Sequence, residues 1–255
     1  MGELLSSDTI LNKVENYLQY QKERGDKFVL KPSAPTPKKE KGIIIKSVTK
    51  PETIENTTSQ LGDWKNASSL AELKLAISNC KECPLGDQRT KFVFGEGNPN
   101  ADIMIIGEAP GKDEDLQGMP FVGRAGQLLT KILESIGLNR EDVFIGNICK
   151  CRPPENRQPE TGEVDKCEPY LKKQIELINP AFILSLGLTS INTLLKTKNK
   201  MADIRGQVLD YHGKKLLVTY HPAALLRNPN WKRFVWEDMK NLKSLYDEHL
   251  KNKEK

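Results

Sequence analysis

The sequence lacks any apolar run of about 18 residues, the length at which a segment is read as a membrane-spanning helix. Its N-terminus also lacks the basic stretch followed by an apolar stretch that marks a secretory signal. We therefore expect a soluble, cytoplasmic protein that does not bind membranes. In a reducing compartment the five cysteines should be reduced or metal-bound rather than paired in disulfides.

Two nucleotide-binding motifs are absent as well. Neither Gly-Lys-Ser/Thr nor G-x-G-x-x-G follows a strand-like run, so nothing indicates nucleoside triphosphate or dinucleotide chemistry. A strong charge of one sign is also missing. The 39 Lys and Arg against 34 Asp and Glu give a net charge of +5, which permits an anionic partner without requiring one.

Composition divides the chain into three segments. Residues 1–30 carry an amphipathic pattern that predicts a helix, expected to pack on the rest of the chain or to bind a partner. Residues 31–66, rich in Pro, Lys, Thr and Asn, predict a flexible linker. Residues 67–250 hold nearly all the periodic apolar segments and are expected to form a single domain with the hydrophobic core.

Strand and helix patterns alternate within the third segment. Short apolar runs predict strands near 102–107, 143–148, 182–186, 207–211 and 216–220. Amphipathic patterns predict helices near 70–80, 125–136, 163–178 and 231–249. This alternation predicts a three-layer α/β fold with a largely parallel sheet and a hairpin near its end.

A glycine-rich stretch, GEAPGKDEDLQGMPFVGRAG at residues 107–126, separates the first of these strands from the next long helix. Ligands bind in α/β folds beyond the carboxyl ends of the strands, and glycine lets the backbone approach a ligand closely. The stretch also holds Glu108, Glu114 and Asp115 together with a single aromatic residue, Phe121. We therefore predict a functional loop rather than a plain connector.

The cysteines suggest a metal centre. Cys80 and Cys83 form a C-x-x-C pair, and Cys149, Cys151 and Cys167 form a distant second set. Four thiolates serve structural zinc and iron-sulfur clusters alike, so spacing leaves these two interpretations open, with ordinary buried thiols as a third. Without a nearby histidine the centre should be structural, and Cys149 is interpreted as a small buried apolar residue.

Three separated motifs together resemble the family 4, iron-sulfur, uracil-DNA glycosylases: the loop at 107–126, NICKCRPPENRQP at 147–159, and HPAALLRNP at 221–229. The resemblance runs from about Cys80 to the last helix and implies that residues 67–250 form the catalytic domain. It implies a three-layer α/β/α sandwich with a central, mostly parallel four-stranded sheet.

The family's cluster ligands fall on four positions of this chain. The resemblance thus implies a structural 4Fe-4S cluster held by Cys80, Cys83, Cys151 and Cys167, with Cys149 unligated. It implies a monomeric DNA repair enzyme that flips uracil out of single- and double-stranded DNA and hydrolyses its N-glycosidic bond, leaving an abasic site. The N-terminal extension lies outside the resemblance and is a candidate site for a replication or repair partner.

The resemblance also assigns roles in the base pocket. Phe121 would stack on the flipped uracil, and the amide of Asn147 would read its Watson-Crick edge, because an amide offers both a donor and an acceptor. His221 would donate a hydrogen bond to uracil O2 and stabilise the leaving anion. Glu114 would lie near uracil C5 and reject the methyl group of thymine; a solvated position is the alternative for Glu114 and Asp115.

Glu108 is the candidate for orienting water or countering charge at the sugar. Another branch of the superfamily uses an aspartate one position later, where this chain has Ala109, so the group that activates water stays open at this point.

DNA contacts are expected from two segments. Leu225 or Leu226 would wedge into the gap left by the flipped base, and Arg227 would meet a phosphate. Asn156 and Arg157 would contact the DNA backbone, and such contacts make binding salt-dependent.

Two other functions remain open on the sequence. One is a related glycosylase that removes other deaminated bases, and the other is a non-catalytic, four-cysteine nucleic-acid-binding module.

Overall fold

The computed structural model describes residues 63–253. The expected N-terminal helix and nearly all of the expected linker lie outside these residues. The last residues assigned to the linker, Trp64–Asn66, instead form a 3₁₀ turn. Trp64 packs edge-on against Tyr170 with the ring centres 4.9 Å apart, so the ordered domain extends at least to Trp64.

The described residues form one sheet in the order β1-β3-β2-β4-β6-β5. Its strands are β1 (Glu96–Gly97), β2 (Ile103–Gly107), β3 (Phe144–Asn147), β4 (Phe182–Leu186), β5 (Leu209–Tyr211) and β6 (Lys214–Thr219). The four central strands are parallel, whereas β1 and β5 pair antiparallel at the two edges. The parallel core and the β5-β6 hairpin confirm the predicted fold. The two-residue β1 was not predicted, because so short a strand leaves no periodic pattern.

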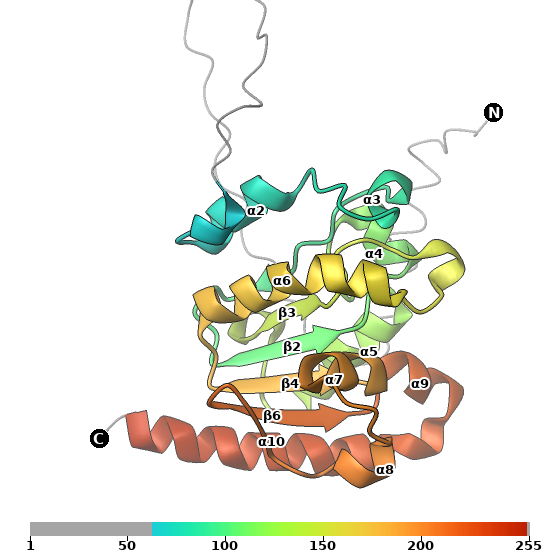
Figure 1. Cartoon of the computed structure of the whole chain (residues 1–255). Coiled ribbons are helices and arrows are strands. Elements are labelled where there is room, and N and C mark those ends of the chain that lie inside the picture. The colour runs from blue at the N-terminus through green and yellow to red at the C-terminus, as the bar shows by residue number, and fades with distance from the viewer. Residues whose placement is uncertain (1–62, 254–255) are drawn as a thin grey trace, which may run out of the picture. The chain divides into compact units, whose positions relative to one another are not determined.

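Helices cover both faces of the sheet (Figure 1). They are α2 (Leu70–Ile77), α3 (Leu85–Gln88), α4 (Lys112–Gln117), α5 (Arg124–Glu134), α6 (Thr161–Ile178), α7 (Leu188–Leu195), α8 (Met201–Ile204), α9 (Pro222–Arg227) and α10 (Lys232–Lys253). The expected long helices appear within a few residues of their predicted bounds. Within residues 63–253, no helix is long and apolar enough to cross a membrane.

The short helix α4 lies inside the stretch that was expected to be a loop. It begins after Gly111, and acidic residues in its first turn suit the positive end of a helix. It ends at Gly118, which adopts a left-handed conformation with φ of 78°. The glycines of this stretch thus begin and end a helical turn as well as forming a loop.

Alternation along the strands divides the core between the two faces of the sheet. Met104 and Ile106 of β2 join one buried cluster, which includes residues of α2 and α6. Ile103 and Ile105 join the other, which includes residues of α5 and α10. Both faces of the sheet are therefore buried, and the carboxyl ends of the strands are left for a site.

The parallel strands end on the same side of the molecule, where the arrowheads of β2, β4 and β6 point towards α9 (Figure 1). Gly107, the last residue of β2, pairs in register with Asn147, the last residue of β3. His221 follows β6 and begins α9. Strand register thus brings together side chains that are more than a hundred residues apart in sequence.

A buried lysine lies just beneath this edge. Lys150 has no exposed surface, and its Nζ donates to the carbonyl oxygen of Asn147 at 2.8 Å and to Oε1 of Gln174 at 2.5 Å. Gln174 in turn donates from Nε2 to the carbonyl oxygen of Phe94 at 2.9 Å. Burial lowers the pKa of Lys150 to about 8, because a charged ammonium is costly away from water. The two acceptors offset part of that cost by accepting hydrogen bonds from Nζ.

Replacing Gln174 should therefore destabilise the domain. Gln174→Leu keeps the volume but removes an acceptor from Lys150 and a donor from Phe94, and we expect a loss of about 3 kcal/mol in the free energy of unfolding. Urea unfolding measures this loss, with Gln127→Leu on the exposed surface of α5 as the matched control. Equal midpoints for the two variants would contradict the stabilising role of the network.

Candidate active site

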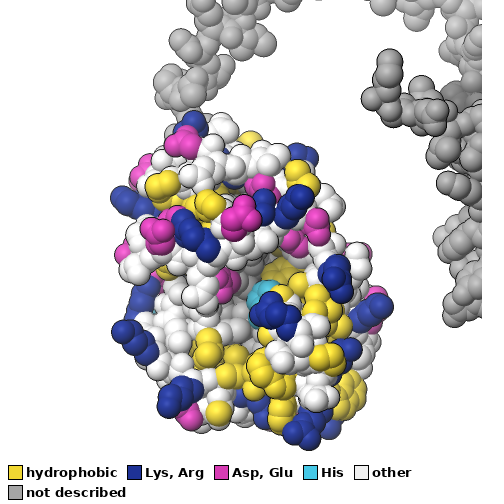
Figure 2. All heavy atoms as spheres, turned by 90° about the vertical axis from the view of Figure 1, so that its right-hand side faces the viewer, with side chains coloured by type: hydrophobic (Ala, Val, Ile, Leu, Met, Phe, Trp, Pro, Cys, Tyr) yellow, Lys and Arg dark blue, Asp and Glu magenta, His cyan; other side chains and the backbone are white. Residues whose placement is uncertain are grey.

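A pocket of about 470 Å³ lies at the carboxyl edge of the sheet. Figure 2 looks onto this side of the molecule and shows a hollow in which a histidine side chain is visible. Nine of the residues predicted from the sequence line the pocket: Glu108, Ala109, Glu114, Phe121, Asn147, Asn156, Arg157, His221 and Arg227. They come from the three motifs at 107–126, 147–159 and 221–229, which the fold brings together around one pocket.

Close packing around Gly107 shapes the floor of the pocket. A Cβ atom at this position would lie 2.4 Å from Oδ1 of Asn147 and 2.6 Å from Cζ of Phe121. Neither distance is possible between unbonded atoms, so a side chain at residue 107 would displace both groups. Glycine here lets the amide and the ring approach the end of β2.

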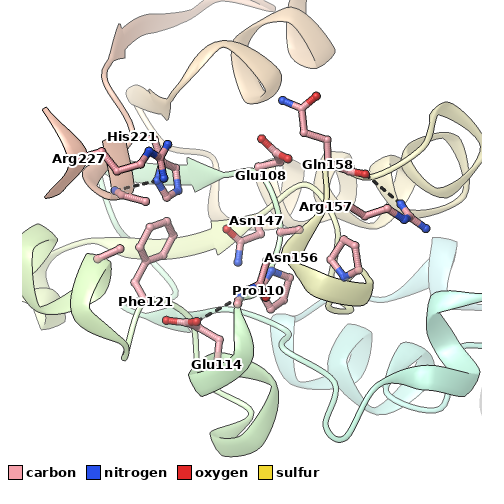
Figure 3. Close-up of a pocket in the computed structure, with 15 residues that line it drawn as sticks. Glu108, Pro110, Glu114, Phe121, Asn147, Asn156, Arg157, Gln158, His221 and Arg227 are labelled. Carbon is pink, nitrogen blue, oxygen red and sulfur yellow. Dashed lines mark hydrogen bonds between the residues drawn. The ribbon is translucent and has the colours of Figure 1, made fainter. Parts of the chain in front are cut away.

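Asn147 presents an unpaired acceptor. Its side chain is 2% exposed, and Oδ1 is buried without a hydrogen-bond partner among the described residues. Figure 3 shows the amide pointing into the pocket between Phe121 and Glu108. A buried acceptor without a partner costs about 1–3 kcal/mol, so the geometry indicates a ligand that supplies an N–H or O–H group.

Phe121 is held in an unusual backbone conformation, with φ of 53°. The guanidinium of Arg140 donates to the carbonyl oxygen of Phe121 at 3.1 Å and to that of Pro120 at 2.8 Å. A Cβ at Gly126 would lie 1.8 Å from the Phe121 carbonyl oxygen, so only glycine fits beneath this turn. These contacts fix the ring, which lies 5.6 Å from the ring of His221.

His221 is neutral near pH 7 and has a defined tautomer. Its Nδ1 accepts a hydrogen bond from the backbone N–H of Ala223 at 3.1 Å. Burial, with a smaller effect of the nearby charge of Arg227, lowers the pKa of His221 to about 4. The single imidazole hydrogen therefore lies on Nε2, which can donate to a ligand in the pocket.

Glu108 is a half-buried carboxyl group on the wall of the pocket. Burial raises its pKa, and a hydrogen bond with Thr189 partly offsets that rise. Its backbone carbonyl accepts from the N–H of Cys149 at 3.0 Å, which continues the pairing of β2 and β3 past the strand ends. The neighbouring Ala109 contributes only a methyl group to the wall, so Glu108 is the acidic residue at this point.

Glu114 and Asp115 are not solvated loop residues. Glu114 accepts hydrogen bonds from the backbone N–H groups of Val122 and Gly123, both at 2.9 Å, and of Gly111 at 3.1 Å. Asp115 is 4% exposed and accepts from the N–H of Thr90 at 2.9 Å. The solvated alternative is therefore wrong for both, and the bonds of Glu114 hold α4 against the turn that carries Phe121.

The segment after His221 corrects one predicted DNA contact. Leu225 is 1% exposed and packs in the core with α5 and α10, so it is not available to enter DNA. Leu226 is 40% exposed and is the leucine that can reach a ligand. Leu225 and Leu226 point in different directions because successive side chains on a helix are about 100° apart. Arg227 is exposed at the mouth of the pocket.

An ion pair holds the segment between β3 and α6. Arg157 forms two hydrogen bonds with the carboxylate of Glu163, at 2.9 and 2.7 Å, and also donates to the carbonyl oxygen of Gln158. This pairing occupies much of the guanidinium that was predicted to contact DNA. Asn156 is exposed, with its Oδ1 accepting from Nε of Arg152 at 2.8 Å.

The cysteines come from three segments, and hydrogen-bonding groups lie close to three of their sulfur atoms. Arg89 donates to Sγ of Cys151 at 3.2 Å, and the backbone N–H of Lys150 donates to Sγ of Cys167 at 3.2 Å. Sγ of Cys80 lies 3.3 Å from the Tyr170 hydroxyl. Donors of this kind stabilise thiolate rather than thiol, as metal ligation requires.

Within residues 63–253 no three Cys, His, Asp or Glu side chains lie close enough to hold a single metal ion. Cys149 is 1% exposed, as predicted, and the neighbouring Cys167 thiol together with burial raises the pKa of Cys149.

Sequence reasoning missed the residues that support this site. Arg89, Arg140 and Thr189 have no recognisable motif, because each acts through contacts with distant segments. Lys150 had one available signal: it is a charged residue between two cysteines, directly after an apolar strand.

Comparison with known proteins gives a consistent result. Residues 94–240 match the model of the uracil DNA glycosylase superfamily. The chain is 45% identical over 186 residues to the Type-4 uracil-DNA glycosylase of Sulfurisphaera tokodaii, covering 69% of this chain and 84% of that protein. It is 48% identical over 176 residues to the Type-4 enzyme of Saccharolobus solfataricus, covering 66% and 82%, respectively. The match to the Type-4 enzyme of Thermotoga maritima is 45% over 172 residues, covering 66% and 90%.

The matched region includes the pocket, the loop between β2 and α5, and the segment after β6. The relatives are covered over more than four-fifths of their length. The chain therefore belongs to the type-4 family of the uracil-DNA glycosylase superfamily.

Proposed function

We propose that this protein removes uracil from DNA by hydrolysing the N-glycosidic bond, and so begins base excision repair at deaminated cytosines. The observation that carries the proposal is the unpaired Oδ1 of Asn147, buried beside the ring of Phe121 in a pocket large enough for a base. Uracil offers an N3–H donor next to an O4 acceptor. An amide matches both groups, with Oδ1 accepting from N3–H and Nδ2 donating to O4.

His221 stabilises the base as it leaves. When the C1′–N1 bond breaks, negative charge develops on the uracil, including its O2 atom. A neutral imidazole that donates from Nε2 can bind this oxygen without first losing a proton, and a donor fixed in place is most effective where charge develops in the transition state. The low pKa of His221 and its bond from Ala223 support this role.

Glu108 acts on the sugar side of the C1′–N1 bond, whereas His221 acts on the base. Positive charge grows on the sugar while the base departs, and a carboxylate on the pocket wall counters that charge and orients a water towards C1′. The glutamate lies near Asn147 in Figure 3, on the side of the pocket opposite Phe121. Leu226 and Arg227, exposed beside the mouth, fill the gap left by the flipped base and contact a phosphate.

Four cysteines hold a structural 4Fe-4S cluster in this proposal: Cys80, Cys83, Cys151 and Cys167. The chemistry of the donor set fits the group, because Sγ of Cys151 accepts from the Arg89 guanidinium and Sγ of Cys167 accepts from the backbone N–H of Lys150, as suits thiolate ligands. When bound, it ties the segment before α3 to α6 and to the loop that lines the pocket.

Base release tests the function directly. Cluster-loaded protein is incubated with oligonucleotides that carry one uracil, one thymine or one hypoxanthine, single-stranded and duplex, and alkali then reveals abasic sites. We expect cleavage only at uracil, a loss of about 10²- to 10³-fold in rate for His221→Ala, and at least as large a loss for Asn147→Ala. Binding without release of any base would instead favour a non-catalytic module, and release of hypoxanthine would favour a broader glycosylase.

The protonation state of His221 gives an independent test. Because burial lowers its pKa to about 4, the folded protein should keep this imidazole neutral from about pH 5 upward, whereas an exposed histidine titrates near pH 6.5. NMR of ¹⁵N-labelled histidine should show Nε2–H throughout this range. A titration of His221 near pH 6.5 would contradict donation from a neutral ring.

Two alanine variants separate the cluster ligands from their neighbour. Cys167→Ala removes a proposed ligand and should lower the iron content and the visible absorption of the purified protein. Cys149→Ala, a matched control in which a buried cysteine two residues from Cys151 is replaced, should keep both. Loss of iron from both variants alike, or bound zinc in the native protein, would contradict the assigned ligand set.

A further inference from the structure

The backbone carbonyl of Asn147 points away from the neighbouring strand β2. The N–H of Ile148 donates to the carbonyl oxygen of Gly107 at 3.0 Å, and in a trans peptide the carbonyl of Asn147 must then point to the other side. On that side the pairing of β1 with β3 involves Phe144 and Ile145 and stops two residues short of Asn147. This buried carbonyl therefore needs a donor from outside the sheet.

The side chain of Lys150 supplies that donor. It has no exposed surface, and its Nζ lies 2.8 Å from the carbonyl oxygen of Asn147. Nζ also donates to Oε1 of Gln174 on α6 at 2.5 Å, and Gln174 donates to the carbonyl oxygen of Phe94, two residues before β1. These two side chains thus bond the backbone groups that β1 and β3 leave unpaired at this point.

The backbone of Lys150 is held as firmly as its tip. Its N–H donates to Sγ of Cys167 at 3.2 Å, and its carbonyl oxygen accepts from the N–H of Val93 at 2.9 Å. Cys167 and Gln174 both belong to α6. Because both ends of the lysine are bonded to that helix, Lys150 ties the peptide of Asn147 to the position of α6.

The position of this peptide decides where the Asn147 amide lies. Its side chain is 2% exposed and packs against Gly107, and Oδ1 has no hydrogen-bond partner among the described residues. Packing and the backbone therefore orient Oδ1. A displacement of about 1 Å in a group that holds the substrate can lower a reaction rate by about a hundredfold.

We propose that Lys150 is a positioning residue for base recognition: it bonds the carbonyl of Asn147 and so sets the side-chain amide against the Watson-Crick edge of uracil. This inference rests on the function proposed above. Lys150 is fully buried and acts through Asn147, which lines the pocket. Its own bond to Cys167 makes it a direct link between the cysteine site and the base pocket.

Single-turnover excision of uracil from duplex DNA tests the proposal. Lys150→Met keeps most of the length of the side chain but removes the donor, and we expect the rate to fall about tenfold to a hundredfold. Gln174→Leu leaves the lysine but releases its tip, so it should lower the rate in the same direction by a smaller factor. If Lys150→Met does not fold, Gln174→Leu carries the same comparisons.

A control variant separates this effect from a loss of stability. Leu242→Ala removes a fully buried side chain of α10 from the core on the other face of the sheet, and so destabilises the domain without touching Asn147. At a temperature where all variants are folded, its rate should stay within about twofold of the wild type. Equal losses in Leu242→Ala and Lys150→Met would overturn the proposal.

DNA binding supplies a readout that a merely structural role would not move. One duplex carries a 2′-fluorinated uracil nucleotide, which resists excision, and a second carries an abasic site. Lys150→Met should weaken binding of the uracil duplex about tenfold, because the amide is misplaced, but should change binding of the abasic duplex by less than about twofold. Equal losses for the two duplexes, or no loss for either, would overturn the proposal.

The iron content of the variants gives the last comparison. Lys150→Met leaves all four proposed cysteine ligands and the backbone N–H beside Cys167 in place, so it should keep the iron of the wild type. A loss of iron in step with the loss of rate would mean that Lys150 acts on the cysteines alone, and would overturn the proposal. If the wild-type protein releases no uracil in the same assay, it is the function proposed above that fails.

Discussion

The absence of a side chain at Gly107 is the constraint on which the site depends. Oδ1 of Asn147 and the ring of Phe121 both occupy the space where a Cβ atom would stand, at 2.4 and 2.6 Å. Two further constraints follow from it. The turn carrying Phe121 must adopt a positive φ, which Gly126 and Arg140 make possible, and Asn147 must end its strand in register with Gly107.

Burial then gives each polar group its chemical character. His221 is neutral because a charged imidazole is costly in this environment, and Oδ1 of Asn147 is left unpaired until a base enters. Glu108 is partly shielded from water, so its charge depends on the few donors around it. The pocket is therefore organised before the substrate arrives, which is what makes electrostatic stabilisation effective.

Much of this was predictable from the sequence, and the exceptions have a common cause. The apolar runs predicted the parallel strands, and three motifs predicted the residues that meet in the pocket. The burial of Leu225 rather than Leu226 could not be predicted, because it depends on how α9 rests on α5 and α10. Likewise, the bonds that Glu114 accepts and the bond from Gln158 to the Thr189 hydroxyl join segments that are distant in sequence.

A crystal structure of the protein with abasic DNA and free uracil would test the central claim most directly. We predict uracil stacked on Phe121, with N3–H donating to Oδ1 of Asn147 and Nε2 of His221 donating to O2. Uracil bound elsewhere, or bound here with Oδ1 still unpaired, would contradict the claim that this amide is the group that recognises the base.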